Sequence, residues 1–297
     1  MELTSPVGVD HFTAALRVIA TISRTTEKNM LIDSHCHLDF PELKEDLPAL
    51  LARAREAGVG LMVTISTRVA KFADLKEIVE THDNVFCSIG THPNNAAEEP
   101  DITAAELIGI ARHPKVVAIG EAGLDYHYDY APPDVQAKSF RQHIAAARET
   151  GLPLVIHSRD ADEDMARILE EETARGPFPF ILHCFTSGPD LARRGLALGG
   201  YVSFSGVVTF KKASELRDIA VSVPDERLLV ETDAPYLAPE PYRGKTNEPA
   251  YVAKTAARLA EVRGIGADAL ATLTTDNFFR LFKKVPRAAL KESLDAA

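Results

Sequence analysis

The chain has few cysteines, no long apolar run and no excess of basic residues, and each shortage excludes a class of protein. Its 297 residues include three cysteines, Cys36, Cys87 and Cys184, all within or beside apolar segments. An odd cysteine count without a secretory signal sequence favours the reducing cytosol, so we expect a cytoplasmic protein. No apolar run approaches the ~18 residues of a transmembrane helix, so we expect no membrane association.

The balance of charge argues against a broad surface for nucleic acid. The chain has 43 acidic and 33 basic residues, which gives a net charge of −10. Proteins that hold long duplex DNA over their surface usually carry a basic face. If this protein acts on nucleic acid, a metal site and a few local cations must bind the phosphates. Strand ends or short pieces are then the expected substrates, rather than the middle of a duplex.

Residues 1–29 differ from the rest of the chain. They contain a short mixed segment and a polar stretch, and Met30 directly precedes the first strand-like run. Arg17 and Arg24 are features of a targeting peptide, but nearby acids dilute that composition. We therefore expect residues 1–29 to be an extension outside the folded domain, or a segment upstream of the true start, and residues 30–297 to form one domain.

From Met30 onward, short apolar runs rich in Val, Ile and Leu alternate with amphipathic segments. Near-continuous apolar runs of this kind are typical of strands that are buried on both faces of a parallel sheet. Eight such runs occur: Leu31–Asp33, Leu61–Ile65, Val85–Ile89, Val116–Ile119, Leu154–Ile156, Phe180–Leu182, Tyr201–Phe204 and Leu228–Val230.

Helical segments fill the gaps between these runs. Three of them end directly before a glycine, as a helix C-terminus predicts: Leu47–Ala57, Val135–Thr150 and Asp160–Arg175. Eight successive β-α units predict a closed (β/α)8 TIM barrel, an α/β fold. We expect the last helical region, Ala267–Lys284, to pack against the outside of the barrel.

Histidines and acids follow most of the predicted strands. The residues just past the eight strands are, in order, His35, Ser66, His92, Glu121, His157, His183, Gly206 and Asp233. The carboxyl ends of barrel strands converge on the active-site face, so these side chains should meet there. The other histidines fall in loops or helices, where we expect them to be solvated or locally hydrogen-bonded: His11, His82, His113, His127 and His143.

His35 and His37 are the first candidate metal ligands. In an extended segment, residues i and i+2 point to the same side, so both imidazoles can reach one metal ion. Cys36 then points away, and we expect it to be a small buried residue.

Glu121 stands in the apolar segment Ala-Ile-Gly-Glu-Ala-Gly. A carboxylate buried alone is costly, and no arginine is near in sequence to pair with it. A bridging position between two metal ions would remove that cost. His157 and His183, each after three apolar residues, fit a second metal position.

Asp233 is the last ligand candidate, and its carboxylate is also a candidate general base. Glu231 lies two residues earlier, so its side chain should lie on the same side and support a ligand by hydrogen bonding. The proposed donors are nitrogen and oxygen without thiolate. This set favours two ions of Zn²⁺, Mn²⁺ or Mg²⁺ over a structural zinc.

Several motifs occur together in a specific order: His-x-His at 35–37, Gly-Glu-x-Gly-Leu-Asp at 120–125, Ile-His-Ser-Arg at 156–159, His-Cys-Phe at 183–185, Glu-Thr-Asp-x-Pro-Tyr-Leu at 231–237 and Pro-Tyr-Arg-Gly-Lys-x-Asn-Glu-Pro at 241–249. Their combination resembles the TatD family of metal-dependent deoxyribonucleases. The resemblance covers residues 30 to about 284, and residues 1–29 have no counterpart in the family's usual pattern.

The resemblance implies an amidohydrolase-like barrel with two metal ions that acts on DNA. One ion would be held by His35, His37, Glu121 and Asp233, and the second by the bridging Glu121 with His157 and His183. His92 matches a family histidine that is not counted among the metal ligands, and we expect it to contact the substrate. Arg243 and Lys245 match a basic loop after the eighth strand and are expected to bind a phosphate.

The sequence therefore predicts a deoxyribonuclease, exonucleolytic on single-stranded or frayed DNA ends, with no obligate protein partner. One alternative is an amidohydrolase-like enzyme that cleaves an acyl ester, a lactone or a small phosphoester. Many of those enzymes bridge their metals with a carbamylated lysine at the fourth strand, where this chain has Glu121. The other alternative is a non-catalytic metal-binding scaffold, against which the complete ligand set argues.

Overall fold

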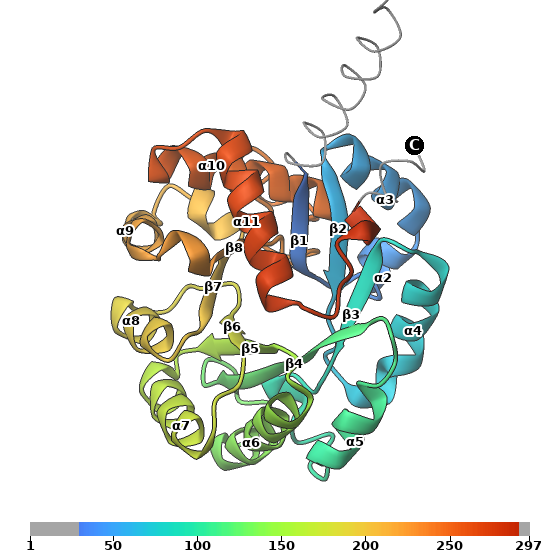
Figure 1. Cartoon of the computed structure of the whole chain (residues 1–297), viewed down its shortest axis with the longest axis vertical. Coiled ribbons are helices and arrows are strands. Elements are labelled where there is room, and N and C mark those ends of the chain that lie inside the picture. Colours follow the sequence, from blue (N-terminus) through green and yellow to red (C-terminus); the bar gives the residue numbers. More distant parts are fainter. Residues whose placement is uncertain (1–29, 291–297) are drawn as a thin grey trace, which may run out of the picture.

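Eight parallel strands follow one another in chain order around a nearly closed barrel in the computed structural model, which describes residues 30–290 (Figure 1). The expected extension over residues 1–29 lies outside the described residues. The strands are β1 (Leu31–Cys36), β2 (Val59–Thr64), β3 (Val85–Ile89), β4 (Val116–Asp125), β5 (Leu154–Arg159), β6 (Phe180–Leu182), β7 (Tyr201–Phe204) and β8 (Leu228–Val230). The predicted TIM barrel is confirmed.

The seam between the last strand and the first is closed just beyond β8. Cys36 forms a parallel bridge with Ala234. The Thr232 backbone amide donates to Oδ1 of Asp33 at 2.8 Å, and its hydroxyl donates to Oδ2. Burial raises the pKa of Asp33 to about 8. These contacts bring the segment after β8 against β1, where the candidate ligands lie.

Helices surround the barrel and connect consecutive strands (Figure 1). Gly58 and Gly151 have positive φ angles of 83° and 69°, and they follow the ends of two predicted helices as expected. The α-helices are α2 (Pro41–Lys44), α3 (Leu47–Glu56), α4 (Phe72–Thr81), α5 (Ala104–Ile110), α6 (Pro133–Thr150), α7 (Asp162–Arg175), α8 (Pro189–Ala197), α9 (Ser214–Ser222), α10 (Val252–Arg263) and α11 (Ala267–Leu281). Short 3-10 turns are η1 (Val69–Lys71), η2 (Pro93–Asn95), η3 (Gly206–Thr209), η4 (Asp225–Arg227) and η5 (Pro249–Tyr251).

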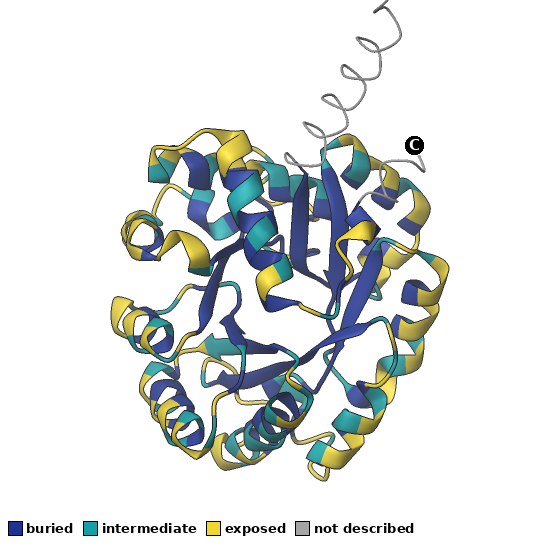
Figure 2. Ribbon diagram, in the orientation of Figure 1, coloured by how far each residue is buried: buried dark blue, intermediate teal, exposed yellow. Residues whose placement is uncertain are grey.

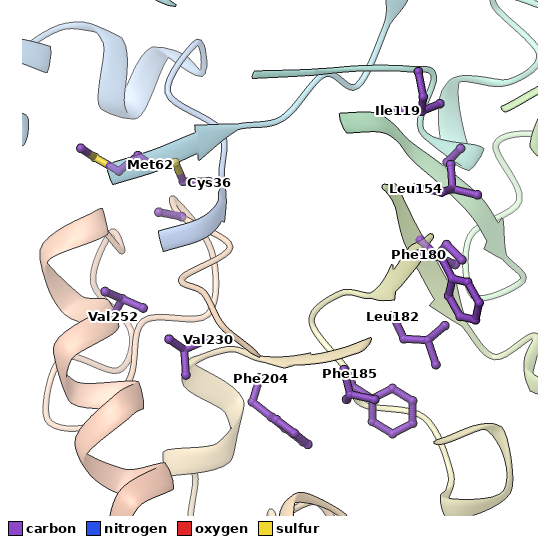
Figure 3. Packing of buried hydrophobic residues seen from close by; sticks show 14 of the residues in the cluster. Cys36, Met62, Ile119, Leu154, Phe180, Leu182, Phe185, Phe204, Val230 and Val252 are labelled. Atoms are coloured by element: carbon purple, nitrogen blue, oxygen red, sulfur yellow. The ribbon is translucent and has the colours of Figure 1, made fainter. Parts of the chain in front are cut away.

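Each strand buries both of its faces. Side chains such as Ile119, Leu182 and Phe204 pack in an outer layer against the helices (Figure 3). Their neighbours, such as Val155 and Ile181, point into the barrel and form a separate inner cluster. The strands are buried except for the last three residues of β5, whereas the helices expose their outer faces (Figure 2). Burial on both faces explains why the strands read as continuous apolar runs.

Helix α11 does not lie on the outside of the barrel as expected. It crosses one end of the barrel (Figure 1), where Phe278, Leu281 and Phe282 join the inner cluster. The Thr275 hydroxyl donates to the carbonyl of Met30, directly before β1, at 2.7 Å. The helix therefore seals the end where the strands begin. The functional face is the opposite end, where the strands finish.

Three strands continue past the C-terminal ends of their predicted apolar runs. As a result, His35, Glu121 and His157 lie inside β1, β4 and β5 rather than beyond them. Backbone pairing continues through these polar residues, and Gly123 pairs with His157 across β4 and β5. No helix in the described range 30–290 is long and apolar enough to cross a membrane.

Candidate metal centre

The first group of donor atoms comes from β1, β4 and the segment after β8. Nε2 of His35 and Nε2 of His37 lie 3.2 Å apart. Oδ1 of Asp233 is 3.5 Å from each of these nitrogens. Oε2 of Glu121 is 3.4 Å from the His35 nitrogen and 4.0 Å from the His37 nitrogen. The structure thus brings together the four side chains expected around one ion.

The backbone at Asp233 turns its carboxylate into this group. Asp233 has a φ of 59°, in the left-handed region that non-glycine residues rarely adopt. Its amide donates to the His35 carbonyl at 2.9 Å, which ties the turn to β1. Such backbone conformations cluster at functional sites because the surrounding structure must hold them in place.

The second group of donor atoms surrounds the other oxygen of Glu121. Nε2 of His183 lies 2.7 Å from Glu121 Oε1, and Nδ1 of His157 lies 2.9 Å from the same oxygen. Glu121 therefore stands between the two expected groups, with one carboxylate oxygen facing each.

The ionised form of Glu121 is favoured by the histidines around it. The carboxylate is almost fully buried, which opposes ionisation. The neighbouring His183 and the hydrogen bond with His157 help to outweigh that cost, and the pKa of Glu121 is well below its usual value. In the described part of the chain, histidines rather than lysines or arginines surround this carboxylate. Converging imidazole nitrogens and carboxylate oxygens form a donor set that fits divalent metal ions.

Two further carboxylates orient the histidines. Nε2 of His157 lies 3.0 Å from Oδ2 of Asp125, and Nδ1 of His183 lies 3.2 Å from Oε1 of Glu231. Carboxylates in this position fix the ring orientation of a metal-binding histidine. The expectation for Glu231 fits this contact. Asp125 was not singled out from the sequence, although it lies four residues after Glu121 and so on the same side of β4.

Gly123 allows β4 and β5 to approach closely beside the site. It has a φ of 154°, and a Cβ atom at this position would lie 1.9 Å from the carbonyl oxygen of His157. Only glycine fits such an approach without displacing the neighbouring strand. The second glycine of the Gly-Glu-x-Gly-Leu-Asp motif is thus explained by packing around His157.

His92 lies directly beside the second donor group. Its Nε2 is 3.5 Å from Oε1 of Glu121 and 3.3 Å from Nδ1 of His157. Burial lowers the pKa of His92 to about 3, so its ring is neutral at physiological pH. His92, Glu121 and His157 together form a third set with ligand geometry. The position is compatible with either a metal contact or a substrate contact.

The basic loop after β8 lies on the surface. Arg243 and Lys245 are both exposed. The Arg243 guanidinium stacks over the Phe210 ring at 4.1 Å and lines a cavity of about 670 Å³ together with Lys211 and Lys212. The sequence analysis did not single out these two lysines. They follow β7, and the residue just past that strand is Gly206, which has no side chain that could bind a ligand.

The remaining expectations about side chains can also be compared with the structure. Cys36 is fully buried in the outer layer and points away from the donors, as predicted. His127 is exposed and hydrogen-bonds Asp160, whereas His143 is fully buried in α6 and contacts backbone groups. His143 is thus locally hydrogen-bonded but not solvated.

A barrel closed at one end and lined with metal-binding donors at the other defines a metal-dependent hydrolase of the TIM-barrel class. Residues 32–283 match the family described as TatD related DNase. The chain belongs to the TatD family, and the resemblance inferred from its motifs is confirmed.

Relatives and solved structures agree with this assignment. The chain is 44% identical over 255 residues to the uncharacterized metal-dependent hydrolase YcfH of Escherichia coli K12, a match that covers 85% of this chain and 95% of YcfH. It is 41% identical over 254 residues to the uncharacterized metal-dependent hydrolase YabD of Bacillus subtilis, covering 86% and 99% of the two chains. The crystal structure of YjjV, a TatD homologue from E. coli, superposes with a TM-score of 0.81 at 32% identity and covers 87% of this chain and all of YjjV.

Proposed function

We propose that this protein is a nuclease that cleaves phosphodiester bonds of DNA and prefers single-stranded or frayed ends. The observation that carries the proposal is the position of Glu121, whose two carboxylate oxygens face two separate groups of donors. A shared carboxylate between two such groups suits a pair of cations acting on one phosphoryl group. The description of the matching family as a DNase supports this choice of substrate.

In this proposal, His35, His37, Glu121 and Asp233 hold one ion, and Glu121, His157 and His183 hold the other. When bound, two divalent cations would lower the pKa of water to near neutrality and offset charge on the phosphoryl oxygens. Zn²⁺, Mn²⁺ and Mg²⁺ all remain candidates for a mixed nitrogen and oxygen donor set.

Asp233 is the proposed general base. Burial opposes its ionisation, but the hydrogen bond with His37 and the nearby His35 and His183 hold its pKa below the usual value. The carboxylate is therefore ionised at neutral pH and can accept a proton. Its side chain is 15% exposed, more than those of the neighbouring ligands His35, His37 and Glu121, so water can reach it.

His92, Arg243 and Lys245 are the proposed contacts to the substrate. Arg243 offers a planar donor pair that matches a phosphate. Arg243→Ala should lower kcat/KM on oligonucleotides while metal content stays unchanged. If the guanidinium binds a phosphate, the slope of log binding constant against log salt should shrink by about one unit. An unchanged kcat/KM would remove Arg243 from this role.

The preference for strand ends follows from charge. A net charge of −10 leaves affinity to local contacts at the site, so an accessible end should compete better than an intact duplex. We also propose a cytoplasmic location, which agrees with the free thiols of Cys36, Cys87 and Cys184.

The decisive assay uses end-labelled single-stranded, duplex and nicked oligonucleotides with Mg²⁺, Mn²⁺ or Zn²⁺. We expect stepwise shortening from one end, which is abolished by a chelator and by Asp233→Asn. Asp83→Asn, at an exposed position before β3 and so at the end of the barrel opposite the donors, is the matched control and should leave cleavage intact. If no oligonucleotide is cut with any metal, while an acyl ester or lactone is hydrolysed with the same dependence on Asp233, the nuclease proposal is wrong.

A further inference from the structure

Exposed aromatic side chains gather on the same end of the barrel as the candidate metal centre. Among the described residues, five large hydrophobic side chains are exposed: Tyr128, Tyr130, Val221, Tyr236 and Ile265. The three tyrosines all follow β4 or β8, the strands that supply Glu121 and lead into Asp233. Val221 belongs to α9, and Ile265 lies between α10 and α11.

Two of the tyrosines form a stacked pair after β4. The rings of Tyr128 and Tyr130 have centroids 5.3 Å apart and are inclined by 23°. The Arg159 guanidinium, at the end of β5, lies over the Tyr128 ring at 4.9 Å. The His127 ring meets Tyr128 edge-on at 4.8 Å. These contacts hold an exposed aromatic surface with a positive charge beside it.

The third tyrosine is connected to a proposed metal ligand through a row of rings. Phe40 stacks on His37 with centroids 4.7 Å apart, and Tyr236 meets Phe40 edge-on at 6.1 Å. The Tyr236 amide donates to the Asp233 carbonyl at 2.9 Å, so the ring is tied to the turn that carries the proposed base.

Tyr236 and the stacked pair of Tyr128 and Tyr130 reach the same end of the barrel from two different loops. Glu121 on β4 and Asp233 after β8 lie 3.4 and 3.5 Å from the same nitrogen of His35, so the two strand ends that carry these loops meet at the candidate metal centre.

Exposed rings with this arrangement suit unpaired bases. Aromatic side chains bind single strands by stacking on the faces of bases, and this contact tolerates any sequence. Paired bases in a duplex hide those faces. Stacking also supplies affinity without a broad basic surface. The net charge of −10 gives no indication of such a surface in this chain.

We propose that Tyr128, Tyr130 and Tyr236 form a platform on which unpaired bases stack while a neighbouring phosphodiester bond of the same strand reaches the metal centre. The proposal rests on the nuclease function proposed above and adds the side chains that would recognise unpaired bases. Arg159 completes the platform as a cation beside the stacked bases.

The first test uses the lack of tryptophan in this chain. Tyr236→Trp or Tyr130→Trp introduces one indole, whose fluorescence a stacked base quenches. The probe is a single-stranded phosphorothioate oligothymidylate, which resists cleavage during the titration. We expect quenching by this strand and little by an abasic strand of equal length and charge. Equal quenching by both strands would overturn the platform, because only phosphates would then be recognised.

The second test separates the platform from the nuclease function. Tyr128→Leu, Tyr130→Leu and Tyr236→Leu keep apolar bulk but lose the flat ring. Each should weaken binding of a single strand about 5- to 100-fold, the range given by stacking on one base. The ratio of the affinities for normal and abasic strands should fall toward one. Phe279→Leu is the control, because Phe279 is a half-buried ring on α11 with Arg287 over it, at the opposite end of the barrel.

The outcomes are distinguishable. If the wild-type protein cuts no oligonucleotide, the nuclease function fails, and the quenching titration decides the platform by itself. If the protein cuts single strands but the tyrosine variants keep the full preference for bases, the platform fails and the nuclease function stands. Preferential quenching by a peptide or by a duplex over the single strand would also overturn the platform.

Discussion

Oδ2 of Asp125 lies 3.0 Å from Nε2 of His157, while the other ring nitrogen of His157 faces Glu121 at 2.9 Å. Burial opposes ionisation of Asp125, but the hydrogen bonds with His157 and with the amides of Tyr128 and His127 outweigh it and lower the pKa. Asp125 therefore stays charged and holds the His157 ring in one orientation. The contact links the Gly-Glu-x-Gly-Leu-Asp motif to the Ile-His-Ser-Arg motif.

Asp125→Asn should weaken metal binding about 10- to 100-fold, because a neutral amide orients and polarises the imidazole less well than a carboxylate. Equilibrium dialysis against Zn²⁺ or Mn²⁺ measures the affinity. Asp129→Asn, an exposed position on the same loop, is the control. Unchanged affinity in Asp125→Asn would show that the carboxylate does not support a ligand.

Glu121→Ala should reduce the bound metal from about two ions to one or none, because its carboxylate faces both donor groups. Glu121→Gln keeps the shape but removes the charge, so it should preserve the fold better and still lose most activity. Elemental analysis of the purified variants gives the stoichiometry. Glu149→Gln, exposed on α6, is the comparison. Retention of both ions in Glu121→Ala would contradict bridging.

Much of this site could be predicted from the sequence because its determinants are local. Apolar runs mark strands that are buried on both faces, and an alternating pair such as His35 and His37 must share a side. Barrel geometry then brings distant strand ends together. The ligand candidates His157, His183 and Asp233 needed only this reasoning; the structure places the two histidines against Glu121 and Asp233 against His35.

The remaining features depend on long-range packing that periodicity does not encode. Helix α11 has the same amphipathic pattern whether it covers the side of the barrel or its end. Our prediction that it covers the outside was therefore wrong, and the helix crosses the end. β4 continues past its apolar run, and this hid the role of Asp125. The paths of loops cannot be read from the sequence pattern either. For this reason the sequence predicted neither the stacking of Arg243 on Phe210 nor the exposure of the three tyrosines at one end of the barrel.

Gly123→Ala should destabilise the fold and disturb the metal site together. The added methyl group would meet the His157 carbonyl oxygen at 1.9 Å, and the φ of 154° is unfavourable for alanine. We expect a loss of about 1–3 kcal/mol in the free energy of unfolding, as for other strained or overpacked positions. Urea unfolding measures this loss, and metal titration shows whether His157 moves.

Gly109→Ala is the matched control for that substitution. Gly109 lies within α5, and a Cβ atom there meets nothing within 4 Å. Alanine should stabilise this helix by up to about 1 kcal/mol. If the two alanine variants had the same stability, close strand packing at Gly123 would not be the reason for the glycine.

His143 should make stability fall in mild acid. Its ring is fully buried in α6, where Nδ1 donates to the Ser139 carbonyl at 2.8 Å and Nε2 accepts from the Thr91 amide at 2.9 Å. Burial lowers its pKa to about 4, although the Ser139 carbonyl and Glu99 favour the charged form. The neutral ring fits this pair of contacts, because Nε2 must remain an acceptor.

Because the pKa of His143 is lowered in the folded protein, the protein loses stability as the pH falls. The unfolded chain binds a proton at His143 near the ordinary pKa of 6.5, whereas the folded chain binds it only near 4. The contribution of His143 to stability is therefore complete above pH 6.5 and is lost as the pH falls toward 4. With about 1.4 kcal/mol per pH unit, the loss amounts to about 3 kcal/mol. Urea unfolding of the wild type and of His143→Gln at several pH values isolates this part, because other groups titrate equally in both proteins. The stability difference between them should shrink or reverse from pH 7 to pH 4, and a constant difference would mean that His143 has the same pKa in the folded and unfolded protein.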